Sequence, residues 1–187
     1  MIHLFINALA ASAGGGLTYV RNVVPNLEAR QDVRATVLLR SDLRDEFVAT
    51  QRVTFLDQAV SGGTARRFWT EQKNISQLIR SNQADVLISA GNFALRQSPV
   101  PQILLSRNSL YTSHDFLLDV IKRRDYRMWF DTRLKAAVAK WSIREATVTV
   151  APTAAFAHAL RAWTGVEVAA IHHGFDRETF LSGTRRD

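Results

Sequence analysis

IHLFINA at residues 2–8 and SAGGG at residues 12–16 decide the fold class of this 187-residue chain. The first segment is a run of mostly apolar residues, which is typical of a strand buried on both faces of a parallel sheet. Residues 17–29 follow with apolar side chains at helical spacing, namely Val20, Val23, Val24 and Leu27. A buried strand, a glycine-rich turn and an amphipathic helix in this order predict the first unit of an alternating fold.

The rest of the chain repeats this alternation. Further strands are predicted at residues 34–39, 53–56, 86–88, 102–106, 148–150 and 168–171. Helices are predicted at residues 42–50, 64–81, 115–144 and 153–164, with Ser41 as an N-cap and a kink or early end at Pro25. The order predicts an α/β, Rossmann-like domain of three layers, with a mostly parallel sheet of about seven strands.

Composition narrows the class of protein. Hydrophobic residues make up 47% and charged residues 22%, as in globular proteins, and there is no cysteine for disulfides or thiolate metal sites. No apolar run approaches the roughly 20 residues that span a bilayer, and residues 1–7 do not resemble a signal peptide, so we expect a cytoplasmic location. The net charge of +7 favours an anionic partner such as a nucleotide diphosphate, a phospholipid surface or nucleic acid, or else reflects only a basic surface.

The glycine run is a candidate phosphate site. Gly14, Gly15 and Gly16 stand between a strand and a helix, where free N–H groups and the helix dipole attract phosphate. The run is not a dinucleotide fingerprint, because Tyr19 occupies the position of the third glycine, and no G-K-[ST] follows as in a Walker loop. A tight strand-to-helix turn explains the same residues.

Polar residues follow the predicted fourth and fifth strands, where parallel sheets bind ligands. Asn92 and Asn108 have the donors and acceptors to bind sugar hydroxyls, and Arg107 can pair with phosphate. Asparagines in loops are also common turn formers. Neither His114-Asp115 nor His172-His173 has the spacing of a metal site, so no metal is expected.

The helical stretch at residues 115–144 mixes basic and large apolar side chains. Its basic residues are Lys122, Arg123, Arg124, Arg127, Arg133, Lys135 and Lys140, and its large apolar residues include Trp129, Phe130, Leu134, Val138 and Trp141. Two interpretations remain open: a basic amphipathic surface for anionic lipid, or a core helix with a solvated basic face.

Three segments resemble family 4 of the retaining glycosyltransferases, which have the GT-B fold of two Rossmann-like domains. They are residues 6–16, residues 101–108, and residues 148–153 together with 171–180. The last segment, with its His-Gly-hydrophobic-Asp sequence and a following Phe, is similar to the family's passage from the N-terminal domain into the interdomain linker. The family's pair of glutamates, separated by seven residues, is absent from the chain.

The resemblance implies a function and a division of the chain. Residues 1–172 would be the N-terminal, acceptor-side domain and residues 173–187 the start of a linker, with the C-terminal nucleotide-sugar domain missing. Gly14, Gly15 and Gly16 would line the donor diphosphate, and the acceptor, a sugar or a lipid-linked sugar, would contact Asn92, Arg107, Asn108, Tyr111 and His114. The donor would be a nucleotide-sugar substrate with no further cofactor, and transfer would require the chain's own C-terminal domain. Peripheral membrane contact fits this function, and nucleic acid is the least favoured partner.

Two other classes of function remain open on the sequence. The first is a dinucleotide-dependent oxidoreductase domain, although Arg40 and Ser41 stand where such domains place an acidic residue. The second is a non-catalytic basic module that binds membrane or nucleic acid.

Overall fold

All seven strands form one parallel sheet in this computed structural model, which describes residues 1–11, 15–59 and 64–172. The sheet order is β3-β2-β1-β4-β5-β6-β7. The strands are β1 (Ile2–Asn7), β2 (Val33–Arg40), β3 (Val53–Gln58), β4 (Val86–Ser89), β5 (Gln102–Leu105), β6 (Val148–Ala151) and β7 (Ala169–Ala170). The predicted fold class is thus confirmed, and every described strand pair is parallel.

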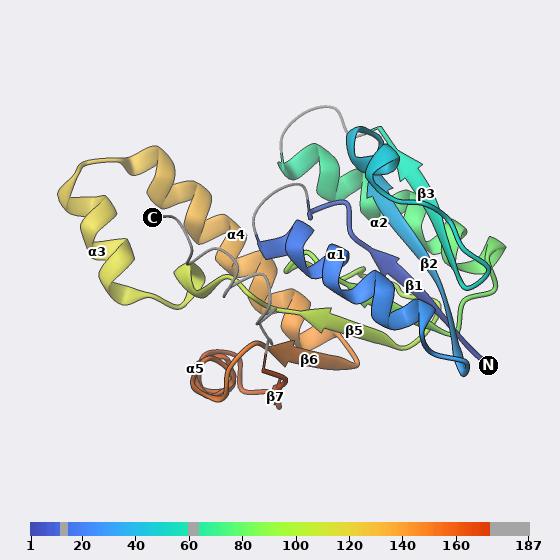
Figure 1. Ribbon diagram of the computed structural model, residues 1–187. Helices are drawn as coiled ribbons and strands as arrows, with labels where there is room; N and C mark the ends of the chain where they lie inside the picture. The colour runs from blue at the N-terminus through green and yellow to red at the C-terminus, as the bar shows by residue number, and fades with distance from the viewer. Residues whose placement is uncertain (12–14, 60–63, 173–187) are drawn as a thin grey trace, which may run out of the picture.

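Helices cover both faces of the sheet (Figure 1). They are α1 (Gly15–Glu28), α2 (Thr64–Ser81), α3 (His114–Lys122), α4 (Tyr126–Glu145) and α5 (Ala154–Thr164), with short 3-10 helices η1 (Ser41–Glu46) and η2 (Ser109–Tyr111). Ile6 of β1 packs with Val20 and Val24 of α1, whereas the adjacent Phe5 packs with Ile75 and Ile79 of α2. Because neighbouring strand residues point to opposite faces, α1 and α2 lie on opposite sides of the sheet.

The side of the sheet that carries α2 also carries α4 and α5. Leu104 of β5 and Ala151 of β6 pack there with Ile143 of α4 and Leu160 of α5. α5 begins with a Thr153 hydroxyl that accepts from the Phe156 N–H, and it ends at Gly165 in the left-handed conformation, a common helix C-terminus.

Three sequence-based predictions were wrong in detail. The stretch 115–144 is two helices, because the chain turns at residues 123–125, where Arg124 has a positive φ of 55° and the Asp125 side chain caps α4. α1 continues through Pro25 to Glu28. Residues 42–50 do not form an α-helix: η1 ends at Glu46, and the Ser41 hydroxyl donates to Asp57 at 2.9 Å rather than capping a helix.

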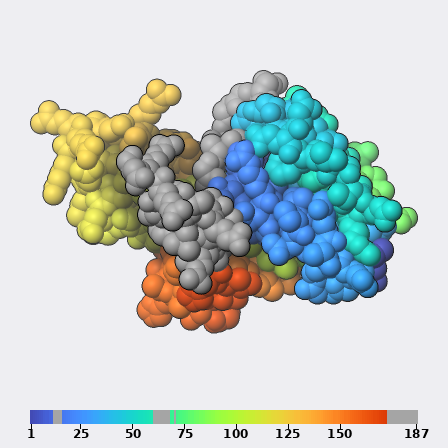
Figure 2. All heavy atoms as spheres, viewed as in Figure 1, coloured from blue at the N-terminus to red at the C-terminus, as the bar shows by residue number. Residues whose placement is uncertain are grey.

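α3 and the first half of α4 project from the body as a separate lobe, visible in both views (Figures 1 and 2). Among the described residues, no helix combines the length and apolarity needed to cross a membrane.

Candidate functional site

The strand order reverses between β1 and β4, and this places a topological switch point at their carboxyl ends. β1 is followed in the sheet by β2 and β3 on one side and by β4 and β5 on the other. The connections that leave β1 and β4 therefore diverge from the same edge, which is where open parallel sheets bind ligands.

The loops after β1 and β4 are packed tightly together at this edge. A Cβ atom added to Gly91 would lie 2.5 Å from the Cβ of Ala10, which is closer than such atoms approach in proteins. A Cβ added to Gly16 would lie 3.0 Å from the Cα of Ala11. Packing therefore requires glycine at position 91 and favours it at position 16, so the structure supplies a reason for Gly16 that needs no ligand.

The predicted phosphate loop is described only in part. Gly15 is the first residue of α1 and Gly16 the second, so the N-terminus of α1 lies directly beyond the end of β1. Gly14 lies outside the described residues.

Arg107 joins three elements at the switch point. Its guanidinium lies over the ring of Tyr19 of α1, 5.2 Å from the ring centroid, and its Nη2 donates to the carbonyl oxygen of Ala90, just after β4. Burial lowers the pKa of Arg107, although the residue stays a cation at any physiological pH. Burial also raises the pKa of the Tyr19 phenol, and the charge of Arg107 opposes that rise. Arg107, which was predicted to pair with phosphate, thus uses its guanidinium to hold α1, β4 and β5 together.

Asn92 is bound to the same cluster. It has a positive φ of 63°, a conformation that asparagine tolerates better than most residues. Its Oδ1 accepts from the backbone N–H of Arg107 at 2.7 Å. Its Nδ2 makes no hydrogen bond to a residue that the structure describes. The oxygen half of the Asn92 amide therefore has a structural role.

The remaining predicted acceptor residues follow β5 in order. The Asn108 Oδ1 accepts from the Leu110 N–H at 3.1 Å and so caps η2, the turn-forming role that asparagine often has. Tyr111 is the half-buried last residue of η2, and His114 is the exposed first residue of α3. The structure thus brings Asn92 and Arg107 into direct contact, and places His114 on the projecting hairpin.

Sequence reasoning missed a buried polar pair at the end of β1. The Nδ2 of Asn7 donates to Oε2 of Glu71 at 3.0 Å, and both side chains are buried. Asn7 also accepts from the Leu9 N–H at 3.2 Å, which fixes the start of the loop after β1. A signal was present, since Glu71 lies three residues after Phe68 and four before Ile75, on the apolar face of α2.

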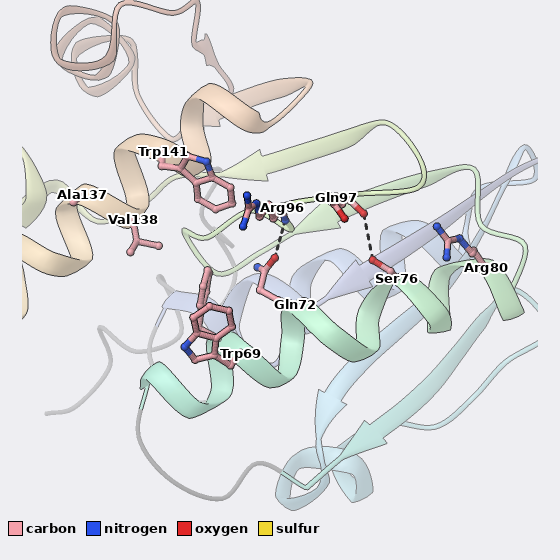
Figure 3. A pocket seen from close by; sticks show the side chains of 10 residues that line it. Trp69, Gln72, Ser76, Arg80, Arg96, Gln97, Ala137, Val138 and Trp141 are labelled. Carbon is pink, nitrogen blue, oxygen red and sulfur yellow. Dashed lines mark hydrogen bonds between the residues drawn. The ribbon is translucent and has the colours of Figure 1, made fainter.

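A groove lies away from the switch point, between α2 and α4 (Figure 3). It has a volume of about 650 Å³, and Trp69 of α2 and Trp141 of α4 stand on its opposite walls. Its amide and hydroxyl groups hold the segment after β4: Gln72 donates to the Ala94 carbonyl at 2.9 Å and accepts from the Arg96 N–H at 2.7 Å. Within the described part of the chain, no cluster of His, Asp and Glu could hold a metal ion.

Comparison with known proteins fits this geometry. The family model described as Glycosyltransferase Family 4 matches residues 13–179. The chain belongs to glycosyltransferase family 4. A UGT transferase from Siraitia grosvenorii, solved in complex with UDP, has a similar fold, with a TM-score of 0.59 at 13% identity. The match covers 98% of this chain and 54% of that one, so the family 4 chain spans about half the length of this GT-B neighbour.

No curated protein matches the chain by sequence. At 13% identity, the likeness to the UGT transferase shows the fold alone. The expected resemblance to family 4 and to half of a GT-B transferase is confirmed. The family assignment leaves no specific observation in favour of the dinucleotide-dependent oxidoreductase.

Proposed function

We propose that residues 1–172 are the acceptor-side domain of a retaining glycosyltransferase, which transfers a sugar from a nucleotide-sugar donor to a sugar or lipid-linked acceptor. The observation that carries this proposal is the switch point between β1 and β4, where the two loops pack together in a chain of family 4. Ligand binding at such an edge is general for open parallel sheets.

The donor side of the proposed site is the N-terminus of α1. Because this helix begins at Gly15, its unpaired N–H groups and positive dipole end lie at the carboxyl edge of the sheet. The difficult step in sugar transfer is departure of the diphosphate from the sugar C1, and fixed donors aimed at the developing charge accelerate such steps. We assign this role to Gly14, Gly15 and Gly16, of which Gly14 lies outside the described residues.

The acceptor side is proposed to include Asn92, Arg107, Asn108, Tyr111 and His114. Asn92 is the best supported of these, because its Nδ2 has no hydrogen bond to a described residue while its Oδ1 is fixed by the Arg107 N–H. Arg107 serves mainly to position Asn92 and the loop after β4, through its contacts with Tyr19 and Ala90.

Transfer is proposed to need a second domain. The chain spans about half of its GT-B neighbour, and residues 173–187, which lie outside the described residues, would begin the linker to that domain. A site with donors on one wall alone would leave the diphosphate largely in water, where each hydrogen bond contributes little. The 187-residue chain alone is therefore expected to be inactive.

The test compares this chain with the longer product of its gene, if the reading frame continues. Release of nucleoside diphosphate is measured with a panel of nucleotide sugars and with sugar and lipid-linked acceptors. Transfer by the longer chain together with none by the 187-residue chain supports the proposal. Absence of transfer by the longer chain with every donor contradicts the assigned function, and full turnover by the shorter chain contradicts the need for a second domain.

Two variants then test the assigned residues. Asn92→Asp keeps an oxygen for the Arg107 N–H but removes the amide donor, so KM for the acceptor should rise about tenfold, the effect of one lost hydrogen bond of roughly 1.4 kcal/mol, with KM for the donor unchanged. Gly15→Val should lower kcat, whereas the matched change Ala154→Val, at the first residue of α5, should not. Unchanged kinetics in Asn92→Asp or Gly15→Val would remove that residue from the site.

A further inference from the structure

The projecting hairpin of α3 and α4 carries an apolar stripe that faces water. Tyr126, Phe130 and Leu134 are 65%, 65% and 56% exposed. They lie at i, i+4 and i+8 on α4, and residues at that spacing share one side of a helix. Scattered apolar residues are common on protein surfaces, but an ordered row of three large side chains on a projecting element marks a binding surface.

The same side of α4 borders the groove in the second half of the helix. Ala137, Val138 and Trp141 continue the apolar side of the helix and line the groove, whose opposite wall is Phe68 and Trp69 of α2 (Figure 3). Val138 and Trp141 are half-buried in this second half, whereas in the first half Tyr126, Phe130 and Leu134 are exposed. The bare half lies on the lobe that extends beyond the sheet (Figure 1).

Basic side chains flank the exposed stripe. At 100° per residue, Arg133 lies about 20° to one side of Tyr126 and Arg127 about 20° beyond Leu134. Lys122 and Arg124 stand at the turn between the helices. Arg123 pairs with Asp119 and Lys135 with Asp131, at 2.9 and 2.6 Å, but the other four cations form no ion pair with a residue that the structure describes. Of the remaining acids, Asp125 caps α4 and Asp115 lies in the first turn of α3.

We propose that this hairpin docks on an anionic lipid surface. The stripe of Tyr126, Phe130 and Leu134 enters the interfacial layer, and Lys122, Arg124, Arg127 and Arg133 pair with headgroup phosphates. An apolar row with a cation on either side and two more at the turn matches the layering of a bilayer surface, which has anionic groups outside and hydrocarbon beneath. Nucleic acid offers no apolar layer for the stripe, and a second copy of the chain would place like charges opposite one another.

The test is co-sedimentation of the 187-residue chain with vesicles. The chain should bind vesicles that contain phosphatidylglycerol, bind phosphatidylcholine vesicles much more weakly, and lose affinity as salt is raised. The double variant Arg127→Gln/Arg133→Gln should lose roughly 25-fold in affinity, about fivefold for each cation. Phe130→Ser/Leu134→Ser should abolish the salt-resistant part of the binding.

Matched controls change the same residue types elsewhere. Val48→Ser removes another exposed apolar side chain, and Arg34→Gln/Lys73→Gln removes two exposed cations on β2 and α2; neither should alter vesicle binding. Circular dichroism and thermal unfolding establish that each variant is folded.

Several results would overturn the proposal. These are absence of binding to anionic vesicles, equal losses in the hairpin and control variants, tighter binding to an oligonucleotide through the same cations, and a concentration-dependent dimer that Phe130→Ser/Leu134→Ser abolishes. Because the readout is binding rather than transfer, the outcome is independent of the proposed enzymatic function.

Discussion

The guanidinium of Arg107 is stacked on the ring of Tyr19, 5.2 Å from the ring centre. This contact ties the segment after β5 to α1. The same guanidinium donates to the Ala90 carbonyl. The pair therefore links α1, β4 and β5 on the side of the sheet that α1 covers.

Replacing Arg107 by Leu should destabilise the domain by roughly 2–3 kcal/mol, since a partly desolvated cation–π contact and a charged hydrogen bond are both lost. Arg107→Lys should fall between the wild type and Arg107→Leu, because lysine keeps the charge but not the planar fork. Urea unfolding measures the change. Arg96→Leu is the control, because that residue is exposed and should cost less than about 0.5 kcal/mol. Equal losses of stability in Arg107→Leu and Arg96→Leu would show that the contacts of Arg107 with Tyr19 and Ala90 contribute nothing to stability.

Gly91→Ala should destabilise by about 1–3 kcal/mol, because the new Cβ would lie 2.5 Å from that of Ala10. The double variant Gly91→Ala/Ala10→Gly should recover most of the loss, since it moves the methyl group to the other side of the same contact. Thermal or urea unfolding of the two single variants and the double variant gives the coupling energy. Purely additive effects would mean that the contact between positions 10 and 91 does not restrict which side chains the two loops can carry.

Glu71→Ala should cost roughly 2–4 kcal/mol, because it leaves the buried Asn7 amide without its acceptor and also leaves a small void. Glu71→Gln keeps an oxygen for the Asn7 Nδ2 and should cost clearly less. Lys73→Ala, two residues away on the exposed side of α2, serves as the control in the same unfolding experiment. If the Ala and Gln variants at position 71 lose equal stability, the hydrogen bond to Asn7 is not what stabilises this corner.

His3 should make the domain less stable in acid. Burial, and then the positive charge of Arg34, lowers the pKa of His3 below its usual 6.5. The unfolded chain therefore binds a proton first, so the His3 contribution is complete above about pH 6.5 and is lost as the pH falls through 6.5 toward the folded-state pKa. Unfolding free energies of the wild type and His3→Gln, measured from neutral to mildly acidic pH, should diverge in that window, with the wild type the steeper. Parallel curves would contradict the shift.

Most of the fold was predictable because its signals are local. The apolar run at residues 2–8 and the amphipathic helix after it carry the alternation of a parallel sheet, and Gly165 ends α5 in the left-handed conformation that glycine favours. The turn between α3 and α4 was not predictable in this way. It contains neither glycine nor proline, and the positive φ of Arg124 accompanies packing of α4 against α3 and η2, residues that local sequence signals do not connect.

The positions of the candidate site residues in the fold were easier to predict than their contacts. The polar residues after β4 and β5 lie at the carboxyl edge of the sheet, as the strand predictions implied, yet Arg107 and Asn108 use their side chains largely to hold the loops. Such assignments depend on contacts between residues far apart in the chain, as between Arg107 and Tyr19. Glu71 was missed for a related reason. Its neighbours in sequence indicated a buried helix face, but its partner Asn7 is 64 residues away.

α4 is much longer than the strand that it leads into. Its 20 residues span about 30 Å, whereas the four residues of β6 span roughly 13 Å. Half of the helix is therefore a strut that overhangs the sheet, and it contains no glycine or proline at which to bend. Whatever meets Phe130 at the far end is therefore held at a fixed distance from β6, because the helix between them has no residue at which to bend.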